Sequence, residues 1–375
     1  RCQTPFSNRF HVDLNHVGLA YRDGIQPQGK TMSLNHKLSR RTVFKGTGAV
    51  AAASALGAGA ALGVASPAHA AGLEVTNQET DGRMQTYTFS SPSFSGKNPP
   101  SNAEVDPRVN VLLPDGYDSG KRYPVLYQFH GGNGTYAEFD NAWKIREVTA
   151  GRDLIVVMPD AGLGWHCNPV HSVFGTRNWE TFHIEELIPW VDATFRTFPE
   201  QAGRAVSGFS MGGFGALKYA AKYSDKFASV SAHSGPANLR SGWAKNLIFL
   251  WANITSHFEF GYPVYGRWPW KQDRISADNP IEHVESYRDK RIFLIAGTDK
   301  SESLLTNPNG WFTKERLFKI LNEDAVLRTQ KEFTDKLDSA GIQYERFEEP
   351  GSHFVRHERL QQDIDGIVAH LRKAE

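Results

Sequence analysis

Ser210 lies in the short stretch VSGFSMGGFGA, residues 206–216, with a glycine two positions before it and another two positions after it. A serine hydroxyl attacks a carbonyl carbon only when it is held exposed, beside a base and beside amide donors for the oxygen that becomes negative. A sharp turn from a strand into a helix exposes Ser210 in this way, and its crowding admits only glycine at positions 208 and 212. The residues before it read as a buried strand and those after it as a closely packed helix. We therefore predict that Ser210 is a nucleophile; the alternative is an ordinary serine in a turn.

Two backbone amides are expected to stabilise the oxygen that becomes negative. One is the amide of Met211, directly after the serine, and the other belongs to a loop that follows an earlier strand. The stretch LYQFHGGNGT supplies such a loop, in which Gly131 and Gly132 let the backbone approach a substrate closely. We predict the amides of Gly132 and Met211 as the two donors. The alternative for this loop is a plain glycine turn.

The histidine of such a set follows the serine and the acid in the chain. ERFEEPGSHFVRHERL places His353 on a glycine-containing loop before the expected final helix, and we predict that it is the general base. His357 is the rival, but it falls a turn into that helix, which favours a surface residue. The two histidines are not a zinc-protease pair, because Phe354 stands where such a helix has a glutamate. No metal is expected.

The carboxylate that orients the histidine has two candidates. Asp299 ends the stretch IFLIAGTD, at the end of an expected strand, where such enzymes commonly carry their acid. Glu323 in KILNEDAVLRTQKEF is the alternative. These residues by themselves leave the choice open.

Apolar runs of strand length alternate with segments of helical spacing, which predicts an α/β protein with a mostly parallel central sheet and helices on both faces. The expected strands are RVNVLLP, YPVLYQFH, DLIVVMP, RAVSGFS, FASVSAHSG, RIFLIAGTD and IQYERFEE. The expected helices include WETFHIEELIPWVDATF and GFGALKYAAKYSDKF. Neither a repeat nor a low-complexity linker divides this part, so we predict one domain over residues 71–375.

An insertion at about residues 238–278 is crowded with aromatic residues and has no strand pattern. It follows a strand end, on the edge where α/β sheets bind ligands. We predict that it forms an apolar wall over the site; the alternative is a small satellite core beneath a long loop. The predicted substrate-binding residues are Trp251, Phe258, Tyr262 and Trp268.

The first 70 residues do not read as part of the folded domain. Residues 32–70 contain Arg40 and Arg41, an apolar run rich in alanine, and small residues at Ala68 and Ala70, which resembles a twin-arginine export signal. Residues 1–31 precede the natural start at Met32, and we interpret them as a leader that is not part of the native protein. Cleavage before residue 71 and an extracellular or cell-envelope location are predicted; an uncleaved membrane anchor is the alternative.

Charge and cysteine content limit the partners of the remaining chain. Residues 1–70 hold eight of the 42 Lys and Arg and two of the 41 Asp and Glu, so the remainder has a net charge of −5. A mildly acidic chain argues against nucleic acid or an anionic membrane as the main partner. Only Cys167 then remains, so no intrachain disulfide is expected, and nothing around it indicates an activated thiolate. No cofactor is implied.

Several of these stretches together resemble one known family. NWETFHIEELIPWV, GFSMGG, YGRWPWKQDRISADNP and the closing GSH are similar to the secreted antigen 85 mycolyltransferases, and more broadly to the esterase D type of α/β-hydrolase. The resemblance covers nearly all of the chain after about Val105 and implies the α/β-hydrolase fold and an acyl-enzyme. In the mycolyltransferases the acid is a glutamate ten residues before a phenylalanine, which Glu323 and Phe333 match; in other esterases of the group it corresponds to Asp299. The resemblance therefore favours Glu323.

The chain departs from the mycolyltransferases at two places. Their oxyanion loop reads Asp-Gly-Leu-Arg, whereas this chain has His130-Gly131-Gly132-Asn133. The amide of Gly132 carries over and the arginine does not. The paired cysteines before their Trp-Glu-Thr-Phe stretch are also absent, which weakens the case for a trehalose acceptor while leaving the acyl-enzyme chemistry intact.

The sequence thus predicts a secreted, serine-dependent carboxylic ester hydrolase with a small-molecule or lipid ester as substrate. A mycolyltransferase-like acyltransferase, which moves the acyl group to a sugar or glycerol hydroxyl, is the first alternative, since the same acyl-enzyme serves both. A non-catalytic binding protein on the same fold is the second.

Overall fold

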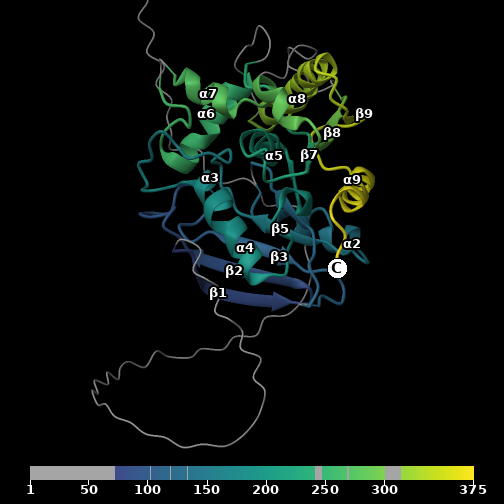
Figure 1. Cartoon of the computed structure of the whole chain (residues 1–375). Coiled ribbons are helices and arrows are strands. Elements are labelled where there is room, and N and C mark those ends of the chain that lie inside the picture. Colours follow the sequence, from purple (N-terminus) through teal and green to yellow (C-terminus); the bar gives the residue numbers. More distant parts are fainter. Residues whose placement is uncertain are drawn as a thin grey trace, which may run out of the picture. The chain divides into compact units, whose positions relative to one another are not determined.

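A nine-stranded sheet crosses the part of the chain that the computed structural model describes, which is residues 72–101, 103–118, 120–132, 134–240, 247–267, 270–299 and 314–375 (Figure 1). The strand order is β1-β2-β3-β5-β4-β6-β7-β8-β9. The strands are β1 (Glu74–Asp81), β2 (Met84–Ser90), β3 (Arg108–Leu112), β4 (Val125–Phe129), β5 (Ile155–Pro159), β6 (Arg204–Phe209), β7 (Ser229–His233), β8 (Arg291–Gly297) and β9 (Glu345–Glu349).

The strands from β5 through β4, β6, β7 and β8 to β9 pair in parallel, whereas β1, β2, β3 and β5 pair antiparallel. All seven expected strands are present, and the predicted, mostly parallel sheet is confirmed. The sequence reading missed β1 and β2. All eight residues of β1 are exposed, so its sequence EVTNQETD lacks the buried positions by which a strand is usually recognised.

Helices cover both faces of the sheet, as predicted. Alternate residues of a strand point to opposite faces, and in β4 Tyr127 packs in one apolar cluster with α4 and α5 while Leu126 packs in a second cluster with α2 and α9. The α-helices are α1 (Glu138–Asn141), α2 (Ile145–Val148), α3 (Trp179–Thr181), α4 (Ile188–Thr194), α5 (Met211–Lys222), α6 (Leu247–Phe260), α7 (Gln272–Asp278), α8 (Lys314–Ser339) and α9 (His357–His370). A π-helical segment (Phe182–Leu187) joins α3 to α4, and 3₁₀ turns occupy Gln201–Gly203 and Pro280–Tyr287.

The aromatic insertion contributes two helices, α6 and α7, between β7 and β8. With α8 they lie at the end of the molecule away from β1 (Figure 1). Within α6, Phe249 is buried and its ring stacks on that of Tyr265 at 5.6 Å between centroids. The insertion therefore has an apolar core of its own and also reaches the site described below.

The predicted leader, export signal and cleavage point lie outside the described residues. Of the helices in the described ranges, none is long and apolar enough to cross a membrane.

Candidate active site

Ser210 lies on a tight turn between β6 and α5, at the carboxyl end of a central parallel strand. Its backbone has φ 55° and ψ −117°, a conformation that non-glycine residues rarely adopt and that marks functional sites. A methyl group on Gly208 would collide with the backbone of Gly212, and one on Gly212 would collide with the carbonyl oxygens of Phe129 and His130. The two glycines are therefore required sterically, for the reason that the sequence suggested.

Ser210, His353 and Glu323 form a hydrogen-bonded series. The Oγ of Ser210 lies 2.7 Å from Nε2 of His353, and Nδ1 of the same ring lies 2.6 Å from Oε2 of Glu323. His353 comes from the loop between β9 and α9, and Glu323 from α8, so segments far apart in sequence converge at one point. An acceptor at Nδ1 fixes the imidazole so that Nε2 can take a proton from the serine.

Glu323 is held by more than the histidine. Its side chain is buried, and its Oε1 accepts hydrogen bonds from the hydroxyl of Ser234, at 3.0 Å, and from the backbone amide of Gly297. The competing acid, Asp299, follows β8, and its amide donates to the carbonyl of Gly351 at 3.1 Å. It is Glu323, and not Asp299, that contacts the ring of His353. His357, the rival histidine, is the first residue of α9 rather than a turn into it, and it lines a different pocket.

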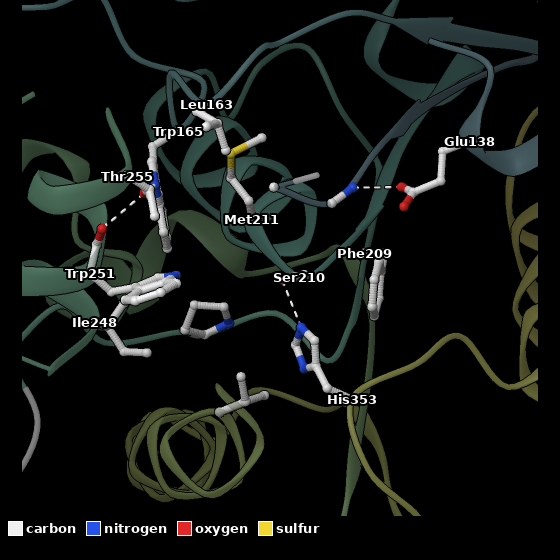
Figure 2. A pocket seen from close by; sticks show the side chains of 14 residues that line it. Glu138, Leu163, Trp165, Phe209, Ser210, Met211, Ile248, Trp251, Thr255 and His353 are labelled. Carbon is white, nitrogen blue, oxygen red and sulfur yellow. Dashed lines mark hydrogen bonds between the residues drawn. The ribbon is translucent and has the colours of Figure 1, made fainter. Parts of the chain in front are cut away.

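A cavity of about 250 Å³ opens at Ser210 (Figure 2). Its two halves differ in chemistry: Glu138 and His353 lie towards one side of Ser210, and an apolar wall that includes Trp165, Ile248 and Trp251 lies on the other. The lining residues are Gly131, Gly132, Glu138, Leu163, Trp165, Phe209, Ser210, Met211, Pro236, Ile248, Trp251, Thr255, Val326 and His353.

The apolar wall joins two segments. Trp165, from the loop after β5, donates from its indole nitrogen to the hydroxyl of Thr255 on α6 at 2.8 Å. That hydroxyl donates in turn to the carbonyl of Trp251 at 2.9 Å (Figure 2). The insertion thus contributes Ile248, Trp251 and Thr255 to the lining of the cavity.

Of the four aromatic residues predicted to bind substrate, Trp251 lines the cavity, whereas Phe258 and Tyr262 do not. Phe258 lies seven residues beyond Trp251 on the same stripe of α6, which is about 10 Å further along the helix axis. Tyr262 follows the helix and packs against His171, with ring centroids 5.2 Å apart. Proximity in sequence does not show how far along a helix a cavity extends. Trp268 lies outside the described residues.

The two predicted amide donors, at Gly132 and Met211, belong to residues that line the same cavity as Ser210. In the described part of the chain neither amide has a hydrogen-bond partner from a loop or side chain. Gly131 lies close to the turn between β6 and α5, because a methyl group there would be 2.9 Å from the ring of Phe209 and 3.6 Å from Cβ of Ser210. The sequence reading did not identify Glu138 or Trp165, although both follow parallel strands at the edge where ligands bind.

Cys167 is buried and free, 3.1 Å from the amino group of Lys218. Burial raises the pKa of its thiol to about 11, which outweighs the opposite influence of the lysine and keeps the thiol protonated near neutral pH. Within the described ranges no three His, Cys, Asp or Glu side chains gather in a set that could hold a metal ion.

The strand-turn-helix elbow in a mostly parallel sheet, with serine, acid and histidine in that chain order, defines an α/β-hydrolase fold. The solved structures similar to the chain agree. They include an S-formylglutathione hydrolase from Agrobacterium tumefaciens (TM-score 0.57, 15% identity, 80% of this chain and 99% of that one). MPT51 of Mycobacterium tuberculosis is similar too, with a TM-score of 0.56 and 19% identity over 76% of this chain and 100% of that one. A ferulic acid esterase has a TM-score of 0.54 and 22% identity over 77% of this chain and 98% of that one.

The chain belongs to the esterase family whose model is described as "Putative esterase" and matches residues 101–370. It is 50% identical over 310 residues to Esterase Rv1288 of Mycobacterium tuberculosis (strain ATCC 25618 / H37Rv), a match that covers 81% of this chain and 63% of that protein. A weaker match, 26% over 190 residues, links 47% of the chain to 62% of the MPT51/MPB51 antigen of the same strain. The expected fold and the resemblance to the esterase and antigen 85 groups are confirmed.

Proposed function

We propose that this protein is an exported carboxylic ester hydrolase that acts through an acyl-enzyme on Ser210. The observation that carries the proposal is the pair of hydrogen bonds, 2.7 and 2.6 Å long, that links Ser210 to His353 and His353 to Glu323 beside a cavity of about 250 Å³. Membership of the esterase family supports the same reaction class.

In the first half of the reaction, Nε2 of His353 accepts the hydroxyl proton while Oγ of Ser210 bonds to the ester carbon. The carbonyl oxygen becomes negative and is stabilised by the amides of Gly132 and Met211. The bond from the carbon to the alcohol oxygen then breaks, and His353 gives its proton to the departing alcohol. Glu323 stabilises the imidazolium that exists between these two proton transfers.

In the second half, a water molecule gives a proton to His353 and bonds to the acyl carbon. The bond to Oγ of Ser210 breaks, the serine recovers its proton from His353, and the carboxylic acid leaves. The ester and one water molecule are the only reactants, and they leave as an alcohol and a carboxylic acid. The substrate we propose is a small-molecule or lipid ester whose acyl group lies against Trp165 and Trp251, since the wall there is apolar.

Acyl transfer to a sugar or glycerol hydroxyl is the second candidate. The similarity to the MPT51/MPB51 antigen and the resemblance to the mycolyltransferases favour it. The acyl-enzyme is common to both reactions, so the acceptor decides the outcome. Incubating the mature protein with envelope lipids, with and without trehalose or glycerol, and identifying the products by mass measures how the acyl group is divided between water and hydroxyl.

Export through a twin-arginine-type signal and association with the cell envelope complete the proposal. They are supported by Arg40, Arg41 and the small residues at Ala68 and Ala70. Replacing both arginines by lysine should leave the protein in the cytoplasm. Amino-terminal sequencing of exported protein should begin at Ala71, and residues before that point would contradict the cleavage site.

The direct test of the chemistry is a fluorophosphonate probe. An active serine hydrolase is labelled at Ser210, and the S210A variant is not. A folded wild-type protein that is not labelled, and that releases no nitrophenol from a short-chain nitrophenyl ester, would instead be a binding protein on the hydrolase fold.

A further inference from the structure

The peptide group between Gly131 and Gly132 is held by contacts that the proposed mechanism does not use. The carbonyl of Gly131 accepts hydrogen bonds from Nδ1 of His130, at 2.7 Å, and from the amide of Gly134, at 2.9 Å. The amide of Gly131 donates to Oε2 of Glu138 at 2.6 Å (Figure 2). Two successive peptide groups of the loop are therefore anchored, one by each side chain.

The tautomer of His130 follows from its second contact. The amide of Ala161 donates to Nε2 at 2.9 Å, so Nε2 carries no proton and Nδ1 is the nitrogen that donates to Gly131. Burial lowers the pKa of His130 to about 4, which keeps the ring neutral near pH 7. This contact to the carbonyl is thus maintained at the pH at which an ester would be hydrolysed.

The direction of the Gly132 amide follows from the same peptide group. In a trans peptide the C=O and N–H point in opposite directions. Because the carbonyl of Gly131 points to His130 and Gly134, the amide of Gly132 points away from both of them. Gly132 lines the cavity beside Ser210, which is where a carbonyl oxygen under attack would lie.

The glycines of this loop make the direction of the Gly132 amide easy to lose. Three of the residues from 131 to 134 are glycines, which adopt many backbone conformations at little cost, so the loop by itself does not fix the direction of an amide. An amide stabilises a developing negative charge most when it is already oriented before the reaction begins. Glu138 supplies a contact of that kind, because it accepts from the amide that precedes the reacting one and a methyl at Gly134 would strike its carboxylate.

We infer that Glu138 is a positioning residue for the oxyanion site: it holds Gly131 so that the amide of Gly132 stays aimed at the carbonyl oxygen of the substrate. The inference rests on the proposed function, since it assigns a part in that reaction. Glu138 acts through the backbone and takes no proton from the substrate. The same role explains why a carboxylate with its pKa raised by burial is retained in the cavity.

The test compares E138A, E138Q and wild type on a short-chain nitrophenyl ester. Loss of an oxyanion donor costs about 10²-fold to 10³-fold in kcat, and misdirection of one should cost about tenfold to 100-fold. We expect that loss in E138A with KM changed less than about threefold, since the contact matters in the transition state. E138Q should recover to within about fivefold of wild type, because its amide oxygen can still accept from Gly131.

A trifluoromethyl ketone separates positioning from a general loss of structure. Its adduct with the serine places an oxyanion in the site, so its affinity should fall in E138A by the same factor as kcat/KM. E147A is the matched control, since the exposed side chain of Glu147 lies on the next helix and pairs with exposed Lys144; it should match wild type. If E138A does not fold, E138D serves, because its carboxylate is one methylene too short to reach Gly131.

An E138A protein with the kcat of wild type overturns the inference, and so does one whose loss lies entirely in KM or leaves the affinity for the ketone unchanged. These results leave the proposed function standing, because wild type still turns over the ester and reacts with the probe. A wild-type protein that neither turns over the ester nor reacts with the probe overturns both the proposed function and this inference.

Discussion

The two sides of the cavity are built by different means. At the reacting side the geometry comes from the backbone: the turn at Ser210 has a rare conformation, and Gly131, Gly208 and Gly212 leave no room for a Cβ. On the other side the surface is made of large side chains, Trp165 and Trp251 among them. A backbone packed this closely admits few changes, whereas a side-chain wall changes shape with one substitution. We propose that this molecule fixes its chemistry at the turn after the central strand and its selectivity in the side-chain wall.

The two sides of the cavity also differ in how deeply the elements that carry them are buried. The turn at Ser210 follows β6, which pairs in parallel with β4 and β7. It leads into α5, whose residues are almost all buried. Helix α6 instead exposes Leu250 and Ile254, each 48% accessible. Changes at the reacting side should therefore stop turnover of every ester, and changes in α6 should alter which ester is preferred.

The largest effect is expected from the nucleophile and its base. S210A and H353A should each remove nearly all ester turnover, leaving at most roughly 10³-fold over water from the oxyanion site and binding. The melting temperature should stay close to that of wild type, because both side chains border the cavity. Steady-state kinetics and calorimetry measure the two quantities. A crippling effect of H357A with little effect of H353A would move the base to the other histidine.

The second prediction concerns the acid. E323Q should lower kcat by about 10²-fold to 10⁴-fold, because an amide beside Nδ1 neither fixes the tautomer nor stabilises the imidazolium. D299N should be milder, since Asp299 acts through the loop next to Gly351. A short-chain nitrophenyl ester is the suitable substrate for both, as it makes little use of the wall. A larger loss in D299N would assign the acid role to Asp299.

The same division explains what the sequence predicted. Steric demands leave a local signature, so the elbow glycines and Ser210 could be read from eleven consecutive residues. Glu323 was favoured only through family resemblance, since its contact with His353 joins positions 30 apart. Trp165 and Glu138 were not predicted as cavity residues, because the lining of a cavity depends on how loops from different strands converge. The spacing of residues in the sequence does not show this. For a related reason Phe258 and Tyr262 do not line this cavity: the aromatic residues of the insertion continue past its end, and the sequence does not show where that end lies.

A third prediction concerns buried His183, whose ring lies 5.4 Å from that of Phe129 at the end of β4. Burial lowers the pKa of His183 to about 3, and its ring contacts the hydroxyl of Tyr219 at 3.0 Å and the carbonyl of Asp160 at 2.7 Å. Below pH 6.5 this ring is protonated in the unfolded chain. In the folded chain it stays neutral down to about pH 3. Stability is therefore lost as the pH falls through that window, by about 2 kcal/mol for this group at pH 5.

The measurement is urea unfolding of wild type and H183Q at pH 7 and pH 5. The difference between the two proteins removes the contributions of groups that they share, including the buried carboxyl of Asp160. Wild type should lose about 2 kcal/mol more than H183Q on acidification. H257Q, which changes an exposed histidine on α6, is the control and should follow wild type. Equal losses in wild type and H183Q would show that the folded state admits a proton at His183.

The smallest effect is expected at the wall, and it tests the division directly. Trp251 lines the cavity from the inner face of α6, so W251A removes apolar surface that a longer acyl chain would cover. Losing about 50 Å² of such contact costs about 1.3 kcal/mol, or roughly tenfold in kcat/KM for an octanoyl nitrophenyl ester. The acetyl ester does not reach the wall and should change less than about twofold. L250A is the matched control, because Leu250 lies on the same helix and faces solvent. A W251A protein that loses the same factor on both esters would show that α6 also supports the elbow, and the separation of chemistry from selectivity in this molecule would fail.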